Sequence, residues 1–127
     1  LSKDYTNCIF SLEKLIQASP GEEIASKAEF MIAEIYLNDF KEYEIASTYY
    51  NNIIENYPTS FNSVKKSIFT LAYIYANHLE YYTDAINFYK KFKHLYPNDP
   101  LIQSIDYELD LLFSISTTID SLLNSSK

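Results

Sequence analysis

The chain has 127 residues, of which 47% are hydrophobic and 21% are charged, with a single glycine and four prolines. Glycine and proline are too scarce to punctuate a many-stranded sheet, so the composition favours an all-α fold. The net charge of −7 opposes nucleic acid as a partner, because affinity for phosphates depends on Lys and Arg, and no apolar run approaches the ~20 residues that a membrane span needs.

The first predicted element is a helix over residues 5–18. Its apolar side carries Ile9, Leu12 and Ile16. The chain opens inside this helix, so we expect it to be a piece of a longer protein. Sliding the sequence by 38 places aligns the segment with the second half of a later repeat and pairs Cys8 with Ala46. Cys8 is therefore expected to be a small buried residue, and the apolar side to be incompletely covered, which favours a homo-oligomer.

Capping residues predict where two helices begin. Ser19-Pro20-Gly21-Glu22 offers an N-cap serine, a proline at the first helical position and a glutamate that completes a capping box. Asp99-Pro100 repeats the device before the last predicted helix.

Two copies of one unit occupy the middle of the chain. Sliding the sequence by 39 places lays residues 27–58 over residues 66–97 without a gap, and 11 of the 32 aligned positions are identical. In each copy, apolar residues recur every three or four places in two successive segments, which predicts a pair of amphipathic helices. The predicted order is a half repeat over residues 1–20, repeats at about 21–58 and 59–97, and a terminal half repeat with a cap over 98–127.

Ala46 and Ala85 recur at the same place in the two copies, where a larger apolar residue would be equally hydrophobic. A small side chain there lets two helices approach closely. We predict that Ala46→Leu overpacks this crossing and that Ser47→Leu costs far less.

The last helix is predicted to be interrupted. The segment "SISTTID" gathers β-branched and hydroxyl side chains, which weaken a helix interior. We expect a break between Ser114 and Thr118, followed by a short capping helix from Ile119 to Asn124 that folds over the last repeat.

These patterns resemble the tetratricopeptide repeat, in which a small residue, a large residue and a proline follow one another as A-x3-F and then P. They stand here as Ala46, Tyr50 and Pro58, and again as Ala85, Tyr89 and Pro97. The segments "FMIAEIY" and "FTLAYIY" are similar to the family's first helix. The resemblance implies an all-α, right-handed solenoid of helical hairpins with about five to six helices. The unit exceeds the family's usual ~34 residues, with one extra residue in the inner turn.

The longer spacing is similar to that of bacterial cell-envelope members, such as the outer-membrane β-barrel assembly lipoprotein and the periplasmic coordinator of the Tol-Pal system. This resemblance implies a non-enzymatic scaffold that binds a protein or peptide partner in a concave groove. It also implies a location in the periplasm or at the periplasmic face of the outer membrane. The alternatives are a structural repeat segment that positions a missing domain, a non-catalytic part of an enzyme subunit, and a cytoplasmic location.

In the family's register, the first helix of each hairpin lines the groove. The residues that this register places there are Lys27, Phe30, Glu34, Asn38, Lys66, Phe69, Tyr73 and Asn77. Phe30 and Phe69 suit the core equally well, and both asparagines suit the C-terminal ends of their helices. Phe30 and Glu34 stand where eukaryotic co-chaperones hold a terminal carboxylate with Lys and Asn, so such a clamp is not expected.

Residues that could support catalysis do not converge in the sequence. His78 falls in an inter-helix turn and His94 on a basic strip, so both are expected to be solvated. No glycine-rich phosphate loop, metal-spaced Cys or His pair or serine-nucleophile motif occurs, and we expect no enzymatic activity and no cofactor. Most tyrosines recur between the copies and are expected in the core, whereas Tyr49, Tyr73 and Tyr81 do not and are candidates for partner contact.

Overall fold

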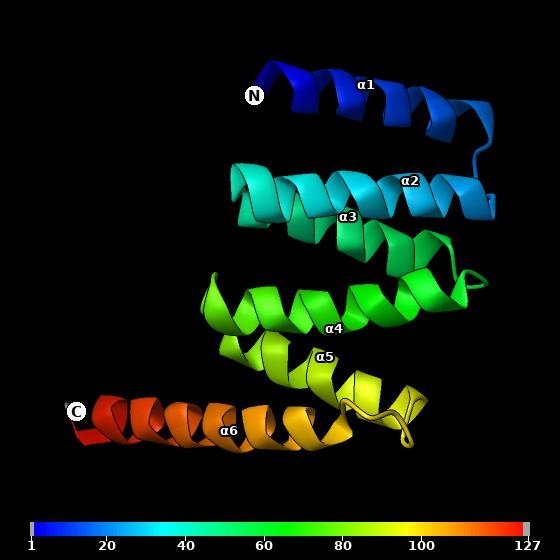
Figure 1. The fold of residues 1–127 in the computed structure, drawn as a ribbon. Coiled ribbons are helices and arrows are strands. Elements are labelled where there is room, and N and C mark those ends of the chain that lie inside the picture. The colour runs from blue at the N-terminus through cyan, green and yellow to red at the C-terminus, as the bar shows by residue number, and fades with distance from the viewer. Residues whose placement is uncertain (1, 126–127) are drawn as a thin grey trace. The chain divides into compact units, whose positions relative to one another are not determined.

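The computed structural model describes the backbone of residues 2–125 and the side chains of residues 4–125. This part of the chain is all-α, as predicted, and within each of its two compact units consecutive helices pack together, as in a tetratricopeptide-type helical repeat (Figure 1). The elements are α1 (Ser2–Ala18), α2 (Glu23–Glu34), the π-helical segment η1 (Ile35–Phe40), α3 (Tyr43–Asn56), α4 (Phe61–Asn77), α5 (Tyr82–Leu95) and α6 (Ile102–Ser125). The chain forms two compact units, Leu1–Leu71 and Ala72–Lys127, which are described separately.

In the first unit, α2 packs against both α1 and α3, and each helix runs antiparallel to the next (Figure 1). The core is built from apolar residues at helical spacing. Those with the least exposure are Ala25, Ala28, Ile32, Ala33, Ala46, Tyr50, Ile53, Ile68 and Leu71. Ala46 is fully buried, as predicted, so α2 and α3 pack with a small residue between them.

The second unit contains the end of α4 together with α5 and α6. Its core residues are Ala72, Ile74, Ala85, Ile86, Tyr89, Phe92, Ile105, Leu109 and Leu112. The rings of Tyr75 and Phe88 are 5.7 Å apart and connect α4 to α5. Ala85 is fully buried, as its counterpart in the first unit is, which confirms the small-residue position in both copies.

The two inner turns of the repeats have the same geometry. Lys41 and Glu80 both adopt the left-handed conformation, with φ of 54° and 57°. The next residue in each turn donates its N–H to a carbonyl six residues back, Glu42 to Tyr36 at 2.8 Å and Tyr81 to Tyr75 at 2.9 Å. In the usual helix ending with a left-handed residue, this N–H bonds to a carbonyl five residues back. The turn here is wider by one residue, which accommodates the extra residue predicted from the sequence.

Cys8 is exposed, and the prediction of a buried thiol is wrong. Its counterpart Ala46 is covered by α2, whereas no described helix packs on the equivalent side of α1. The helix itself is confirmed. Of the three residues on the side that was expected to be incompletely covered, Ile9 is buried, and Leu12 and Ile16 are half-buried. Leu15 on α1 remains 39% exposed and Phe10 58% exposed, so the apolar surface of α1 is only partly covered.

The predicted start of the second helix is also wrong. The helix α2 begins at Glu23, with Glu22 at the cap position and no side-chain capping hydrogen bond. Gly21 has a φ of +79°, which a right-handed helix cannot include, so Ser19–Gly21 form a turn instead. The second capping site is confirmed in part: Asp99 Oδ1 accepts a hydrogen bond from the Leu101 N–H at 2.9 Å, but α6 begins at Ile102 rather than at Pro100.

The predicted break in the last helix is absent. The helix α6 runs without interruption through residues 114–118 and on to Ser125, so there is no separate capping helix from Ile119 to Asn124 (Figure 1). Thr118 Oγ1 donates to the Ser114 carbonyl at 2.9 Å, which satisfies the hydroxyl inside the helix. The β-branched residues each cost only up to about 0.7 kcal/mol in helix propensity, which the neighbouring leucines and continued helical hydrogen bonding offset.

Candidate protein-binding surface

Seven residues of the first unit line an open cavity of about 390 Å³ between α2 and the first turns of α4. We call it the α2–α4 pocket, and it consists of Lys27, Phe30, Met31, Glu34, Asn62, Ser63 and Lys66. Four of these, Lys27, Phe30, Glu34 and Lys66, are among the residues that the sequence assigned to a partner groove. Because residues three and four apart share one face of a helix, the contributions of α2 and α4 follow directly from their sequence spacing.

The walls of the α2–α4 pocket are held by contacts beneath it. The Ser26 and Ser60 hydroxyls are hydrogen-bonded to each other with 2.9 Å between their oxygens, which fixes the start of α4 against α2. The Phe30 ring meets the Tyr50 ring edge-on at 5.6 Å. Phe30 is therefore half-buried on α3 and also reaches the pocket, so its two interpretations, core and groove, both hold in part.

Charge in the pocket is mixed. Lys27 and Lys66 supply positive charge, and the Lys66 Nζ lies 6.0 Å from the centre of the Phe30 ring. Glu34 supplies a carboxylate. Burial raises the pKa of the Tyr50 phenol above its usual value, and the charge of Glu34 raises it further, so Tyr50 is a neutral hydroxyl next to the pocket.

The remaining predicted groove residues do not line the α2–α4 pocket. Asn38 is exposed in η1, and Phe69 is half-buried on α4. Tyr73 and Asn77 belong to the second unit, where Tyr73 is 45% exposed. Asn77 is the last residue of α4, and its Nδ2 donates to the Tyr73 carbonyl at 3.2 Å.

Met31, Asn62 and Ser63 line the pocket and were missed in the sequence. Met31 follows Lys27 by four residues, and Ser63 and Asn62 precede Lys66 by three and four. All three lie on the helix faces that the predicted residues already occupy, so extending the helical spacing in both directions would have found them.

The tyrosines follow the sequence prediction only in part, because five of the eight that recur between the copies are half-buried rather than buried, namely Tyr36, Tyr43, Tyr75, Tyr82 and Tyr96. Tyr50, Tyr57 and Tyr89 are buried, whereas Tyr73 and Tyr81 expose nearly half of their surface. Tyr49 differs from the expectation, because its ring stacks on Tyr36 at 5.7 Å and is only partly exposed.

Polar groups elsewhere are dispersed. His78 and His94 are both exposed, and the His78 ring lies 5.7 Å from that of Tyr73. Within residues 2–125, no three His, Cys, Asp or Glu side chains are placed to bind a metal ion. None of the helices in this part of the chain combines the length and the apolar character that crossing a membrane requires.

Comparison with known proteins gives one match. Residues 27–60 match the family model of the tetratricopeptide repeat. The match supports the tetratricopeptide family. It covers α2 from Lys27 onward, η1, α3 and the turn that leads to α4, and so includes Lys27, Phe30, Met31 and Glu34 of the α2–α4 pocket. Searches of curated proteins and of solved structures gave no match. Tetratricopeptide repeats in general mediate protein–protein interaction.

Proposed function

We propose that this chain is a non-enzymatic scaffold that binds a protein or peptide partner through the α2–α4 pocket. The observation that carries the proposal is the convergence of Lys27, Phe30, Glu34 and Lys66 on one open cavity, within and just beyond the segment that matches a tetratricopeptide repeat. Stacked helical hairpins present such surfaces to extended partners.

The chemistry of the pocket suits a peptide with an apolar side chain between polar groups. Phe30 and the half-exposed Met31 offer apolar contact, and a thioether adapts to varied shapes. Asn62 can both donate to and accept from a peptide main chain, while Lys27 and Lys66 donate to carbonyl or carboxylate oxygens.

We place the scaffold in the bacterial cell envelope, in the periplasm or at the periplasmic face of the outer membrane. The support is the repeat spacing of 39 residues, which resembles that of envelope members of the family. A partner there would be another envelope protein.

Binding can be tested with a random peptide library displayed on phage and selected on the 127-residue chain. Met31→Glu places a charge in the pocket, and Ile24→Glu is its matched control, because both residues lie on α2 and both are 49% exposed. Selected peptides should bind the wild type and the Ile24 variant equally and lose at least about tenfold in affinity for the Met31 variant. Equal binding to both variants would show that the partner surface lies elsewhere.

Location requires a separate test in cells. When the full-length protein is expressed in a bacterium and the cells are fractionated, we expect it in the periplasmic or the outer-membrane fraction. Recovery with cytoplasmic marker enzymes would exclude the envelope, without bearing on whether the pocket binds peptides.

A further inference from the structure

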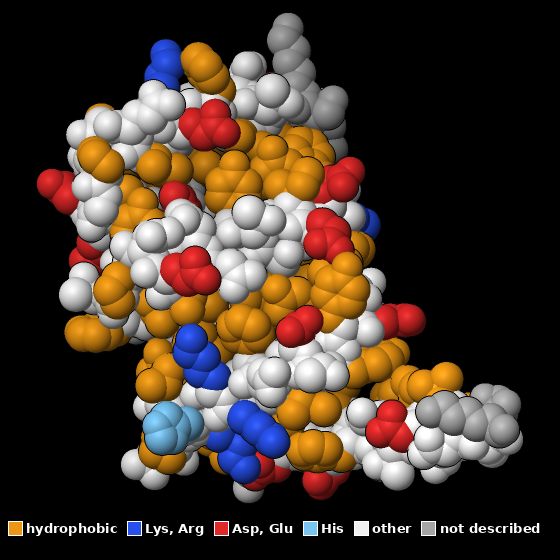
Figure 2. All heavy atoms as spheres, turned by 180° about the vertical axis from the view of Figure 1, so that it is seen from behind, with side chains coloured by type: hydrophobic (Ala, Val, Ile, Leu, Met, Phe, Trp, Pro, Cys, Tyr) orange, Lys and Arg blue, Asp and Glu red, His pale blue; other side chains and the backbone are white. Residues whose placement is uncertain are grey.

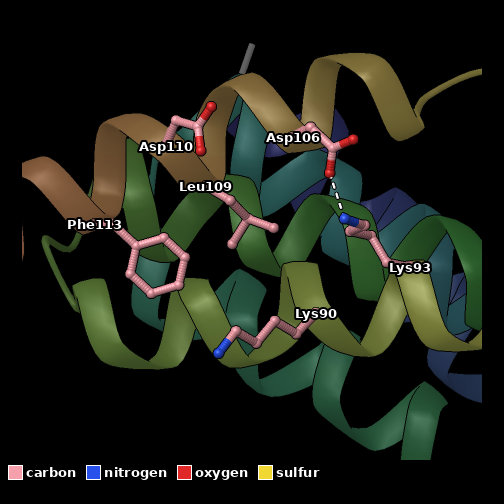
Figure 3. Close-up of a pocket in the computed structure, with 6 residues that line it drawn as sticks. All are labelled: Lys90, Lys93, Asp106, Leu109, Asp110 and Phe113. Carbon is pink, nitrogen blue, oxygen red and sulfur yellow. Dashed lines mark ion pairs between the residues drawn. The ribbon is translucent and has the colours of Figure 1, made fainter.

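The second unit contains a larger open cavity, between α5 and α6. This α5–α6 pocket has a volume of about 590 Å³ and is lined by Lys90, Lys93, Asp106, Leu109, Asp110 and Phe113 (Figure 3). Leu109 and Phe113 extend from α6 toward α5, and Lys93 pairs with Asp106 at 2.5 Å. The pocket therefore has an apolar base with charges of both signs at its edge.

The helices that form this pocket have equivalents in the first unit. Sliding the sequence by 77 places, the two repeat offsets together, lays α1 and α2 over α5 and α6. The slide pairs Glu29 with Asp106, Ile32 with Leu109, Ala33 with Asp110 and Tyr36 with Phe113. Acidic, aliphatic and aromatic characters are kept at three of these four pairs, so α6 presents nearly the same face as α2.

In the first unit, α3 covers that face. Ile32 is fully buried, Tyr36 stacks on Tyr49 of α3 at 5.7 Å, and the Glu29 carboxylate accepts a hydrogen bond from Asn52 of α3. On α6 two of the equivalent positions, Asp106 and Phe113, are open to solvent, whereas Leu109, the counterpart of Ile32, is buried at the base of the pocket. The Asp106 side chain is 50% exposed and Phe113 is 44% exposed. The α5–α6 pocket therefore lies where a helix equivalent to α3 would pack.

The helix α1 corresponds to α3 in the repeat, and one of its faces is not covered by any helix in the described part of the chain. The slide of 38 places pairs Cys8, Leu12 and Leu15 of α1 with Ala46, Tyr50 and Ile53 of α3. Those three α3 residues are at most 1% exposed, because α2 covers them. In α1, Cys8 is exposed, Leu12 is half-buried and Leu15 is 39% exposed. We call Cys8, Leu12 and Leu15 the α1 face.

We propose that the α1 face of a second copy of this chain occupies the α5–α6 pocket, in the place that α3 takes on α2. Leu12 and Leu15 would then lie on Leu109 and Phe113. Charge also agrees with this pairing. Lys14 corresponds to Asn52, whose amide binds Glu29, and Glu29 corresponds to Asp106, so a lysine meets a carboxylate across the interface.

Such a contact joins two different surfaces of the chain. Each copy that contributes its α1 face keeps its own α5–α6 pocket free for another copy. Association through this contact therefore depends on concentration and is not limited to a pair by the contact itself.

Asp110 marks where the pocket departs from the first unit. Its counterpart Ala33 is fully buried, whereas Asp110 is an exposed carboxylate that would lose water when a helix docks. Asp110→Ala should therefore strengthen self-association by at least about tenfold.

The test is sedimentation velocity on the 127-residue chain over a range of concentrations, with reductant present so that Cys8 cannot form disulfides. Leu15→Glu blocks the α1 face, and Phe113→Glu blocks the pocket. Phe10→Glu and Leu122→Glu are the matched controls, because both residues are more exposed than the residues they match and lie outside the two surfaces. Helical circular dichroism checks that each variant folds, and Lys14→Glu, at an exposed position, replaces Leu15→Glu if that variant does not fold.

We expect the wild type and both controls to self-associate, and each blocking variant alone to lose at least about tenfold in association constant. An equimolar mixture of the two blocking variants should form a 1:1 complex, since one retains the pocket and the other the α1 face. A wild type that stays monomeric, loss in only one blocking variant, loss in the controls, or no complex in the mixture would each overturn the proposal.

Discussion

Replacing Ala46 with leucine tests whether the repeat depends on a small residue between α2 and α3. The Ala46 side chain is fully buried, and so is Ala33 on α2. Leucine adds three carbons. If space were available, burying them would stabilise the fold by about 0.8 kcal/mol each, or about 2.4 kcal/mol together. In a close-packed helix crossing they instead force the helices apart, at a cost of about 1–3 kcal/mol.

The sign of the change in stability therefore shows whether the crossing of α2 and α3 requires a small residue. Thermal unfolding followed by circular dichroism should show Ala46→Leu melting about 3–15 °C below the wild type, since about 3–5 °C accompanies each kcal/mol in a chain of this size. Thr48→Leu is the matched control, because Thr48 is exposed on the same helix.

The control suggested by sequence alone was Ser47→Leu, and it would have failed. Ser47 is 5% exposed and its hydroxyl donates to the Glu44 carbonyl at 2.7 Å, so leucine there is costly too. If the Ala46 and Thr48 variants both have the melting temperature of the wild type, close approach of α2 and α3 does not require a small residue at position 46.

Further expectations concern the turns, a buried carboxylate and the tyrosines. Lys41→Gly should raise stability in urea unfolding by about 0.5–1 kcal/mol, because glycine adopts the left-handed conformation without strain, and a lower stability would contradict the assigned turn. Glu29→Ile should cost about 1–3 kcal/mol, because Glu29 is 7% exposed and Asn52 loses its acceptor. Adding Asn52→Leu should recover the part of this loss that comes from the unpaired Asn52 amide, since the second repeat has isoleucine, Ile68, at the position of Glu29. An undiminished loss in the same urea assay would argue against the pairing. Burial raises the pKa of Tyr50 and Tyr89. Their unfolded forms ionise near pH ~10, so the stability that these phenols contribute is complete below that pH and is lost as pH rises beyond it. Phenolate absorbance should show the two groups ionising only together with loss of helix, and ionisation near pH ~10 in a chain that keeps its helical signal would contradict this.

Much of the fold was predictable because the repeat signal and the packing signal coincide. Ala46 and Ala85 stand 39 places apart and both are fully buried, and Tyr50 and Tyr89 follow them into the core. Even the extra residue of the inner turn was visible, since it lengthens the unit. Periodic burial imposes periodic sequence, so sliding the chain against itself recovered most of the helices.

The wrong predictions were made from short sequence patterns at places where the surrounding structure differs from that of the repeats. Cys8 occupies the small-residue position, but burial depends on a covering helix, and the described chain provides none there. At residues 114–118, the small cost in helix propensity did not break α6, and Thr118 satisfies its hydroxyl by donating to the Ser114 carbonyl inside the helix. Ser19 resembled a cap, but the positive φ of Gly21 moved the helix start to Glu23.

The α2–α4 pocket was predictable in its α2 wall and less so in its α4 wall. Lys27, Phe30 and Glu34 share one face of a single helix, so helical spacing alone brings them together. Asn62 and Ser63 join them through the Ser26–Ser60 hydrogen bond, a contact between residues 34 places apart that no local pattern contains.

The wide inner turn also governs how this chain can be recombined with other helical repeats. One residue added to a regular α-helix rotates everything after it by about 100°. The bonds from Glu42 to Tyr36 and from Tyr81 to Tyr75 absorb that rotation before the next helix begins. A chimera joined in the middle of α3 or α5 inherits a whole turn from one parent, and its apolar stripe stays aimed at the preceding helix. A junction placed between residues 36 and 42 mixes two turn lengths, and the following helix would direct Ala46 and Tyr50 toward solvent.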